Sequence, residues 1–193
     1  MKLLEQRIQA EGLVLEGNIL KVDGFLNHQI DAALIKQLAQ EFVRLFAGEK
    51  IEKVLTVEAS GIALACAVAE QLGVHALFAK KTGHKNIAGE VYCAEVLSYT
   101  TGKTYEIIVS TRFLKKGERV LIIDDFLARG QALLGLIEIL RQADAELVGC
   151  GIAIEKGFQD GGRLIRGMGV HLESLAIIES MKEGGNIEFR ECR

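Results

Sequence analysis

Hydrophobic residues recur at intervals of three and four between residues 31 and 48, which places them on one face of a predicted helix that ends at Gly48. The residues in this pattern are Leu34, Ile35, Leu38, Phe42, Leu45 and Phe46. Residues 54–57 then form a short apolar run, a stretch rich in small residues leads to Gly73, and residues 74–79 form a second apolar run. This order predicts a strand, a helix and a strand, which together make one βαβ unit.

The same order of elements returns in the second half of the chain. Residues 120–123 are a continuous apolar run, residues 131–143 have helical spacing, and residues 147–154 are again apolar. We predict a loop at residues 124–130. Strands that are apolar along their whole length are typical of parallel sheets that are buried on both faces. We therefore expect an α/β fold with a central, mostly parallel sheet flanked by helices.

Two segments fall outside these units. Residues 91–98 and 104–111 are strand-like and are joined by a short polar connector, which predicts a β-hairpin. With the lysine-rich stretch before it, this hairpin is expected to form a flexible flap at about residues 80–112. Residues 1–30 contain short apolar stretches broken by glycines, which predicts short strands or turns outside the sheet. We expect them to form a small N-terminal hood, packed together with C-terminal residues on a core of residues 31–193.

Composition and charge narrow the class of protein. The 193 residues suit one domain, and a hydrophobic content of 49% is enough for a sizeable core. A net charge of −3 argues against nucleic acid as the main partner. The N-terminus lacks a signal-peptide pattern, and no apolar stretch approaches the roughly 20 residues that span a bilayer. Cys66, Cys93, Cys150 and Cys192 form no paired motif, which favours free thiols over a metal or disulfide role and a cytoplasmic setting.

The turn after residues 120–123 carries the strongest candidate chemistry. Asp124 and Asp125 follow the apolar run, and small residues then lead into the next helix. The first amides of a helix have no partner within it and lie at the positive end of the helix dipole, so residues 128–132 suit a phosphate. Carboxylates repel phosphate and suit hydroxyl groups or a cation, so the combination predicts a sugar phosphate. The alternative is that Asp125 only caps a turn at a solvated strand end.

An apolar strand, two acidic residues and a short loop that opens a helix resemble the signature of type I phosphoribosyltransferases. The resemblance implies the fold of that family and phosphoribosyl pyrophosphate as a substrate. It implies that Asp124 and Asp125, as catalytic residues, hold the ribose hydroxyls. It also implies that the 5-phosphate is bound by Ala128, Arg129, Gly130, Gln131 and Ala132. Arg129 and Gln131 depart from the family's usual threonine-containing loop, so backbone amides and the Gln131 amide are expected to replace hydroxyl contacts.

A second turn, formed by Glu58, Ala59, Ser60 and Gly61, opens the helix of the first unit. In the family the equivalent loop receives the pyrophosphate, which would again lie at a helix N-terminus. The alternative is that Ser60 is a plain helix cap. The lysines of the connector, Lys80, Lys81 and Lys85, suit the charge of the leaving group, and the alternative for them is a solvated face.

Residues 16–31 and 152–159 resemble the bacterial members of the family that act on xanthine, and the likeness covers essentially the whole chain. It implies a cytoplasmic, homodimeric purine salvage enzyme that converts xanthine to xanthosine monophosphate, with Mg²⁺ entering on phosphoribosyl pyrophosphate and no firm protein ligand for it. The base-binding positions match Leu20, Asn27 and Lys156, which would cover the purine, contact its polar edge and donate to a ring carbonyl. Without the resemblance they are a core residue, a turn residue and a surface charge.

Two alternative functions stay open. The first is a salvage enzyme for guanine or hypoxanthine, which would share every phosphate and ribose feature. Its members carry an aspartate in the phosphate loop where this sequence has Ala128, so no general base is evident here. The second is a non-catalytic regulator of purine genes that senses phosphoribosyl pyrophosphate and binds DNA or RNA, and the net charge of −3 argues against it.

Overall fold

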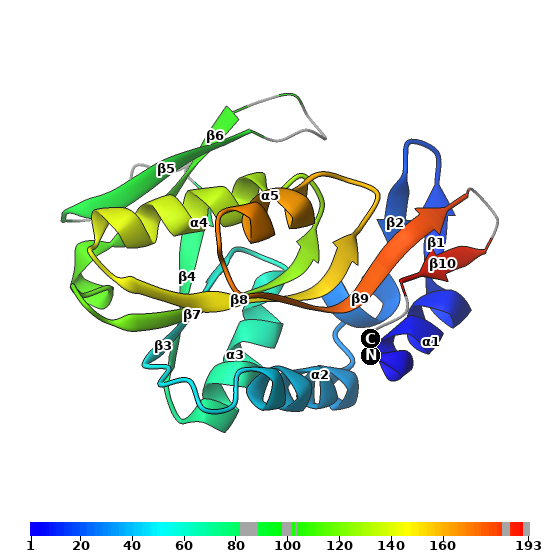
Figure 1. The fold of residues 1–193 in the computed structure, drawn as a ribbon, viewed down its shortest axis with the longest axis horizontal. Helices are drawn as coiled ribbons and strands as arrows, with labels where there is room; N and C mark the ends of the chain where they lie inside the picture. Colours follow the sequence, from blue (N-terminus) through cyan, green and yellow to red (C-terminus); the bar gives the residue numbers. More distant parts are fainter. Residues whose placement is uncertain (82–88, 98–101, 103, 183–185, 191–193) are drawn as a thin grey trace.

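The computed structural model describes residues 1–81, 89–97, 102, 104–182 and 186–190, which form an eight-stranded sheet covered by helices on both faces and a separate two-stranded sheet (Figure 1). The strands are β1 (Leu13–Leu15), β2 (Ile19–Lys21), β3 (Lys53–Val57), β4 (His75–Lys81), β5 (Val91–Leu97), β6 (Thr104–Ser110), β7 (Arg119–Leu127), β8 (Glu146–Lys156), β9 (Leu172–Met181) and β10 (Ile187–Phe189). The helices are α1 (Lys2–Glu11), η1 (Asp23–Asn27), α2 (Ala32–Leu45), α3 (Gly61–Leu72), η2 (Thr111–Phe113), α4 (Gln131–Gln142) and α5 (Gly161–Gly167).

The centre of the large sheet is parallel. Its strand order is β10-β9-β8-β7-β3-β4-β6-β5, and the strands from β9 to β4 run in the same direction. Antiparallel strands lie at both edges, because β10 pairs with β9 and the β5–β6 hairpin pairs with β4. The predicted mostly parallel sheet and its two βαβ units are therefore confirmed.

Each face of the sheet has its own hydrophobic core. Helices α2 and α3 cover one face, where Leu38, Phe42 and Leu64 are almost completely buried. Helix α4 covers the other face through Leu136 and Ile139, which are also buried (Figure 1). Because both faces of the central strands are covered, these strands are apolar along most of their length.

Helix α2 follows the predicted hydrophobic spacing and ends at Leu45, just before Gly48. The Asp31 carboxylate caps it by accepting hydrogen bonds from the N–H groups of Ala33 and Leu34, both at 3.1 Å. Arg7 of α1 donates to the same carboxylate at 3.0 Å. Asp31 therefore starts α2 and also ties the N-terminal segment to the core.

The prediction for residues 1–30 is partly wrong. β1 and β2 are short strands outside the large sheet, as expected, but residues 2–11 form helix α1. Leu4 and Ile8, one helical turn apart, are completely buried, and α1 packs against β9. Two buried positions are too few to reveal a helical period, so this short helix depends on tertiary packing. The division into residues 1–30 and 31–193 stays a prediction, and both parts contribute to one hydrophobic cluster.

Strand β7 is longer than the sequence predicts. The loop predicted at residues 124–130 is wrong for its first part, because β7 continues through Asp124 and Asp125 to Leu127. The neighbouring strand β8 is equally extended and pairs with this segment, for example Asp124 with Ile152 and Leu127 with Glu155. The ladder of hydrogen bonds to β8 overrides the low strand propensity of aspartate.

The predicted β-hairpin is confirmed as β5 and β6, which pair from Val91 with Ser110 to Leu97 with Thr104. It extends the large sheet through β4, and α4 packs against β5. Residues 82–88, which include Lys85, and most of the hairpin's connector lie outside the described residues. The role of the hairpin as a flexible flap stays a prediction.

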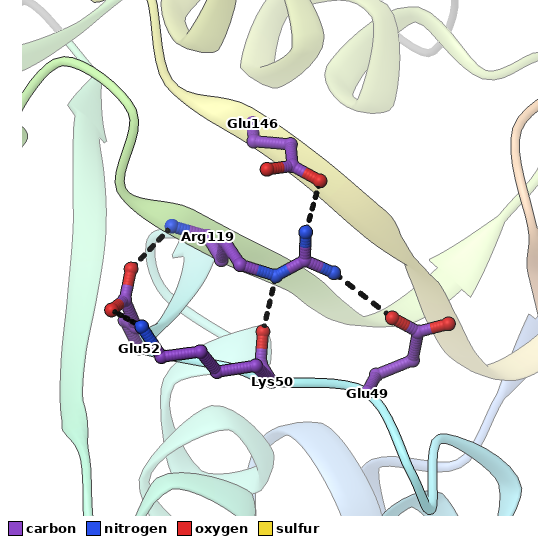
Figure 2. A network of polar contacts seen from close by, with 5 residues as sticks. All are labelled: Glu49, Lys50, Glu52, Arg119 and Glu146. Atoms are coloured by element: carbon purple, nitrogen blue, oxygen red, sulfur yellow. Dashed lines mark hydrogen bonds and ion pairs between the residues drawn. The ribbon is translucent and has the colours of Figure 1, made fainter.

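Arg119, the first residue of β7, joins the segments at the amino ends of the central strands (Figure 2). Its guanidinium donates to the Lys50 carbonyl at 2.7 Å. It also forms ion pairs with Glu49, at 2.9 Å, and with Glu146 at the start of β8. The backbone N–H of Arg119 donates to Glu52 at 3.0 Å. The network therefore connects β7 and β8 to the segment that precedes β3.

We expect Arg119→Met to lower the free energy of unfolding by about 1–2 kcal/mol, because it removes linked ion pairs and a hydrogen bond to a carbonyl. Urea unfolding measures this loss. Arg141→Met is the matched control, since Arg141 is exposed and pairs with Glu138 on the same helix, and it should cost less than about 0.5 kcal/mol. Equal losses in the two variants would show that the network has no special stabilising role.

The thiols of Cys66, Cys93 and Cys150 are free, and Cys192 lies outside the described residues. Burial raises the pKa of the Cys150 thiol to about 12, so this cysteine packs as a small apolar side chain. Among the helices of the described ranges, none has the length and apolar character needed to cross a membrane.

Candidate functional site

Asp124 and Asp125 lie near the carboxyl end of β7 and are each only 5% exposed. The Asp125 carboxylate accepts a hydrogen bond from the Ser60 hydroxyl at 2.9 Å and one from the Asn27 amide at 3.4 Å. The Asp124 carboxylate accepts a bond from the backbone N–H of Asp125 at 3.0 Å. Three predicted parts of the site, the acid pair, the turn at residues 58–61 and the hood residue Asn27, are therefore brought together.

The Asp124 carboxyl is difficult to ionise. Burial and the neighbouring charge of Asp125 raise its pKa well above the usual range, although the Lys81 ammonium opposes this shift. A methyl group on Gly61 would lie 2.6 Å from Asp124 Oδ1 and 2.1 Å from Thr56 Oγ1, so the start of α3 needs glycine beside the acid. A buried acid pair with so little compensating charge is suited to bind sugar hydroxyls or a cation.

A cavity of about 640 Å³ opens beside this strand end. Its wall contains residues 126–133, which comprise the end of β7, the following loop and the first residues of α4. Asp124 and Asp125 immediately precede this part of the wall. The rest of the described wall comes from the β1–β2 turn, the end of β4, the β5–β6 hairpin, and Lys156 with Gln159.

The loop at residues 128–130 turns the chain from β7 into α4. Gly130 has a φ of +82°, a left-handed conformation that favours glycine, and directly precedes the first residue of the helix. The first amides of α4 have no partner within the helix and lie at the positive end of its dipole. All five residues predicted to bind phosphate, Ala128 to Ala132, line the cavity, so an anion there can reach this helix entry.

The second predicted turn lies next to the acids, outside the described wall of the cavity. Ser60 precedes α3, but its hydroxyl donates to Asp125 and makes no capping bond to the helix. The alternative of a plain serine cap is therefore wrong. Glu58 accepts a hydrogen bond from the Lys81 N–H at 2.6 Å, and the peptide between Glu58 and Ala59 is cis. Pyrophosphate binding by this turn stays a prediction.

Lys156, the last residue of β8, lines the cavity as a base-binding residue should. Its ammonium donates to the Asn18 carbonyl in the β1–β2 turn at 2.8 Å and lies 5.9 Å from the centre of the Phe126 ring. Burial lowers the pKa of this ammonium. Lys156 is therefore a hydrogen-bond donor beside a flat apolar ring.

The other two predicted base-binding residues lie elsewhere. Asn27 is half-buried at the end of η1 and is held by Asp125. Leu20 is only 6% exposed and packs in the core beneath the hood, whereas its neighbour Ile19 lines the cavity. Leu20 is therefore not part of the described cavity wall, and contact between Leu20 and a base stays a prediction.

The strand, acid pair and helix entry lie within a segment that matches a known family. The model of the phosphoribosyl transferase domain matches residues 21–162, which include the whole of β7 and α4. The chain belongs to the phosphoribosyl transferase family.

Two relatives of this phosphoribosyltransferase have nearly the same length. The xanthine phosphoribosyltransferase of Lachnoclostridium phytofermentans is 56% identical over 191 residues, covering 98% of each chain. That of Ruminiclostridium cellulolyticum is 52% identical over 191 residues, covering 99% of this chain and 100% of its own. Among solved structures, adenine phosphoribosyltransferase from Rhodothermus marinus superimposes with a TM-score of 0.76 at 19% identity, over 92% of this chain and 100% of its own. The expected type I phosphoribosyltransferase fold is confirmed.

Two aromatic residues in the wall of this phosphoribosyltransferase's cavity are not among the predicted site residues. Phe126 follows the acid pair directly and lines the cavity. An aromatic residue next to predicted site residues suits contact with a flat ligand, and this could have indicated Phe126 from the sequence. Tyr105 of β6 lies across from Lys81, whose ammonium is 5.4 Å from the centre of the ring. Tyr105 had no local signal, because only the pairing of β6 with β4 brings it to the cavity.

Proposed function

We propose that this phosphoribosyltransferase transfers the 5-phosphoribosyl group from phosphoribosyl pyrophosphate to xanthine, giving xanthosine 5'-monophosphate and pyrophosphate. One observation carries the proposal: a single cavity joins the entry of α4, which suits a phosphate, to Lys156 and Phe126, which suit an oxopurine. The names of the relatives at 56% and 52% identity agree with this activity.

The sugar phosphate is proposed to bind along the β7–α4 turn. The amides of residues 128–132 hold the 5-phosphate, and Asp124 and Asp125 accept hydrogen bonds from the ribose hydroxyls. Hydroxyl donors would satisfy carboxylates that burial has separated from water. The turn at residues 58–61 and Lys81, at the end of β4, are proposed to receive the pyrophosphate.

The base is proposed to bind between Phe126 and the hood. The Phe126 ring provides an apolar face, and Lys156 donates to a ring carbonyl. Adenine would place an amino donor against this ammonium, and two donors do not pair, so oxopurines are favoured. Asn27 would contact the polar edge of the base, and Leu20 would cover one face of it.

Positive charge develops on the ribose as its bond to pyrophosphate breaks, as in other glycosyl transfers. The chain contributes by holding the base against the anomeric carbon and by excluding water. Ala128 offers no group that could take a proton from the base. Xanthine is more acidic than guanine or hypoxanthine, so we propose that it binds partly ionised, a form that the Lys156 ammonium stabilises.

Magnesium is proposed to enter with phosphoribosyl pyrophosphate and, when bound, to neutralise charge on the departing diphosphate. The Asp124 and Asp125 carboxylates are the hard oxygen donors that this ion prefers. Within the described ranges, no three His, Cys, Asp or Glu residues are grouped to hold a metal. The residues therefore fit an ion that shares its coordination with the substrate.

We also propose that the protein acts in the cytoplasm as a homodimer. The free thiols of Cys66, Cys93 and Cys150 are consistent with a reducing compartment. Light scattering during gel filtration measures the mass in solution, and a mass near the 21.1 kDa of one chain would exclude the dimer.

The activity is tested by comparing xanthine, guanine, hypoxanthine and adenine with phosphoribosyl pyrophosphate, with and without Mg²⁺. We expect kcat/KM to be about tenfold or more higher for xanthine than for any other base, and activity to disappear when the metal is chelated. A preference for guanine or hypoxanthine would change the base but keep the phosphate and ribose sites. Binding of phosphoribosyl pyrophosphate without turnover of any base would instead support a regulator.

A further inference from the structure

Helix α5 directly supports the loop at residues 128–130. Gly161, its first residue, donates its N–H to the Ala128 carbonyl at 3.1 Å. A methyl group on Gly161 would lie 2.4 Å from that carbonyl oxygen and 2.8 Å from the Gly130 nitrogen. Such an approach requires glycine, because any side chain would push the two backbones apart. The start of α5 therefore packs directly against the loop.

An ion pair between a buried glutamate and an arginine whose side chain is 38% exposed also holds α5 on the sheet. The Glu155 side chain, on β8, is 3% exposed and accepts two hydrogen bonds from the Arg166 guanidinium of α5, both at 2.8 Å. It also accepts one from the Ser174 hydroxyl of β9 at 2.5 Å. A methyl group on Gly162 would lie 1.9 Å from Glu155 Oε1, so the carboxylate packs directly against the backbone of α5. One side chain therefore links α5 to two central strands.

The Glu155 carboxylate is charged despite its burial. Burial alone would raise its pKa, but hydrogen bonds from Arg166 and Ser174 outweigh this effect and hold the pKa below its usual range. Apolar side chains of similar size often stabilise a core as well as a buried charged partner does, and Arg166 is partly exposed to water, so stability is a weak reason for this pair. The two parallel bonds of a guanidinium and a carboxylate also define an orientation, which a hydrophobic contact does not.

We propose that Glu155 and Arg166 are a positioning pair for the 5-phosphate loop. By holding α5 on β8 and β9, they keep Gly161 against Ala128 and Gly130, and so keep the loop amides oriented for phosphate. This role rests on the proposed function, because it assigns those amides to phosphoribosyl pyrophosphate. The pair should therefore affect binding of that substrate and leave binding of the base unchanged, although Glu155 adjoins Lys156.

Steady-state kinetics of Glu155→Gln and Arg166→Met test the pair. We expect the KM for phosphoribosyl pyrophosphate to rise about tenfold or more in each variant, while the KM for xanthine stays within about twofold. Arg166→Lys should recover part of the loss, because it keeps the charge but not the two parallel bonds. Arg163→Met is the matched control, since Arg163 is exposed on the same helix and pairs with Asp160 at 2.7 Å, and it should leave both KM values unchanged.

A pair of glycine variants tests the contact itself and keeps the test open if Glu155→Gln does not fold. Gly161→Ala should displace the loop and raise the KM for phosphoribosyl pyrophosphate as Arg166→Met does. Gly167→Ala places the same methyl group on the same helix, where it meets no described atom within 4 Å, and should leave that KM unchanged. Thermal unfolding shows which variants are folded.

A folded Arg166→Met with an unchanged KM for phosphoribosyl pyrophosphate would overturn the proposal. An equal rise in the KM for xanthine would also overturn it, because the pair would then position Lys156. If the unaltered protein turned over none of the bases, the proposed function would fail separately. Calorimetric titration with phosphoribosyl pyrophosphate alone would then still compare the variants, and absence of binding by the unaltered protein would refute both proposals.

Discussion

Asp124→Asn is expected to lower kcat/KM by about 100-fold or more and, in the same protein, to raise the melting temperature at neutral pH. Asparagine can still accept the hydrogen bond that the Asp125 N–H donates at 3.0 Å. It replaces a carboxyl that burial and the neighbouring Asp125 make costly to ionise, which explains the gain in stability. It also removes the carboxylate oxygens proposed to accept hydrogen bonds from the ribose hydroxyls, which explains the loss of activity.

The sign of the pH dependence follows from the raised pKa of Asp124. The folded protein keeps a proton on this carboxyl at pH values where the unfolded chain has lost it, so the unaltered protein loses stability as the pH rises from 3.8 towards the raised pKa. Asparagine does not titrate. The difference in melting temperature should therefore be small near about pH 4 and grow until the pH passes the raised pKa.

Thermal unfolding without substrate, across this pH range, measures the difference. Asp144→Asn is the control, because Asp144 is exposed and pairs with Lys116 at 3.2 Å, and this variant should keep full activity without a pH-dependent gain. If Asp124→Asn melted below the unaltered protein at neutral pH, the charge on Asp124 would be stabilising the fold, and the account given for the acid pair would be wrong.

Lys156→Met should lower kcat/KM for xanthine by about 100-fold, and it should change the order of preference among the four bases. Methionine keeps most of the apolar stem beside Phe126 but removes the ammonium that donates to the Asn18 carbonyl at 2.8 Å. An ammonium has three donors, so this bond leaves donors for a ring carbonyl of the base. Without the ammonium, oxopurines lose their hydrogen-bond partner and adenine no longer faces an opposing donor, so the rates with the two kinds of base should converge.

Competition assays with xanthine, guanine, hypoxanthine and adenine measure this convergence. Lys116→Met, which removes an exposed ammonium next to Asp144, is the control and should leave the rates unchanged. The KM for phosphoribosyl pyrophosphate should stay within about twofold in Lys156→Met, because the lysine is assigned to the base. An unaltered order of the four bases would mean that Lys156 does not recognise the base.

The chemistry of the β7–α4 turn could be predicted because all its parts are neighbours in sequence. A strand end with an acid pair, followed by small residues that open a helix, can be recognised there without knowledge of the rest of the fold. Lys156 was placed at the site only by the resemblance to the family, because the predicted strand at residues 147–154 ends before it; β8 in fact continues to Lys156, which lines the cavity. The end of β7 was misplaced, because strand propensity does not include the partner strand β8.

Other features depend on contacts between distant segments and had no local signal. Ser60 looks like a helix cap, yet its hydroxyl donates to Asp125. Leu20 gives no sign in the sequence that it packs in the core cluster, where it is only 6% exposed. Glu155 follows the apolar run of residues 147–154, and nothing near it in the sequence indicates its ion pair with Arg166 of α5.

By itself, the sequence determined the succession of central strands and helices along the chain, their mostly parallel sheet, and the turn that suits a sugar phosphate. Hydrophobic periodicity and helix-entry chemistry depend on near neighbours, so these features can be recognised in the chain. The tertiary structure alone decided that the hood includes a helix, which side chains donate to the acids, and that α5 packs against the loop at residues 128–130. These features depend on burial and on bonds between segments far apart in the chain, which exist only once the sheet has formed.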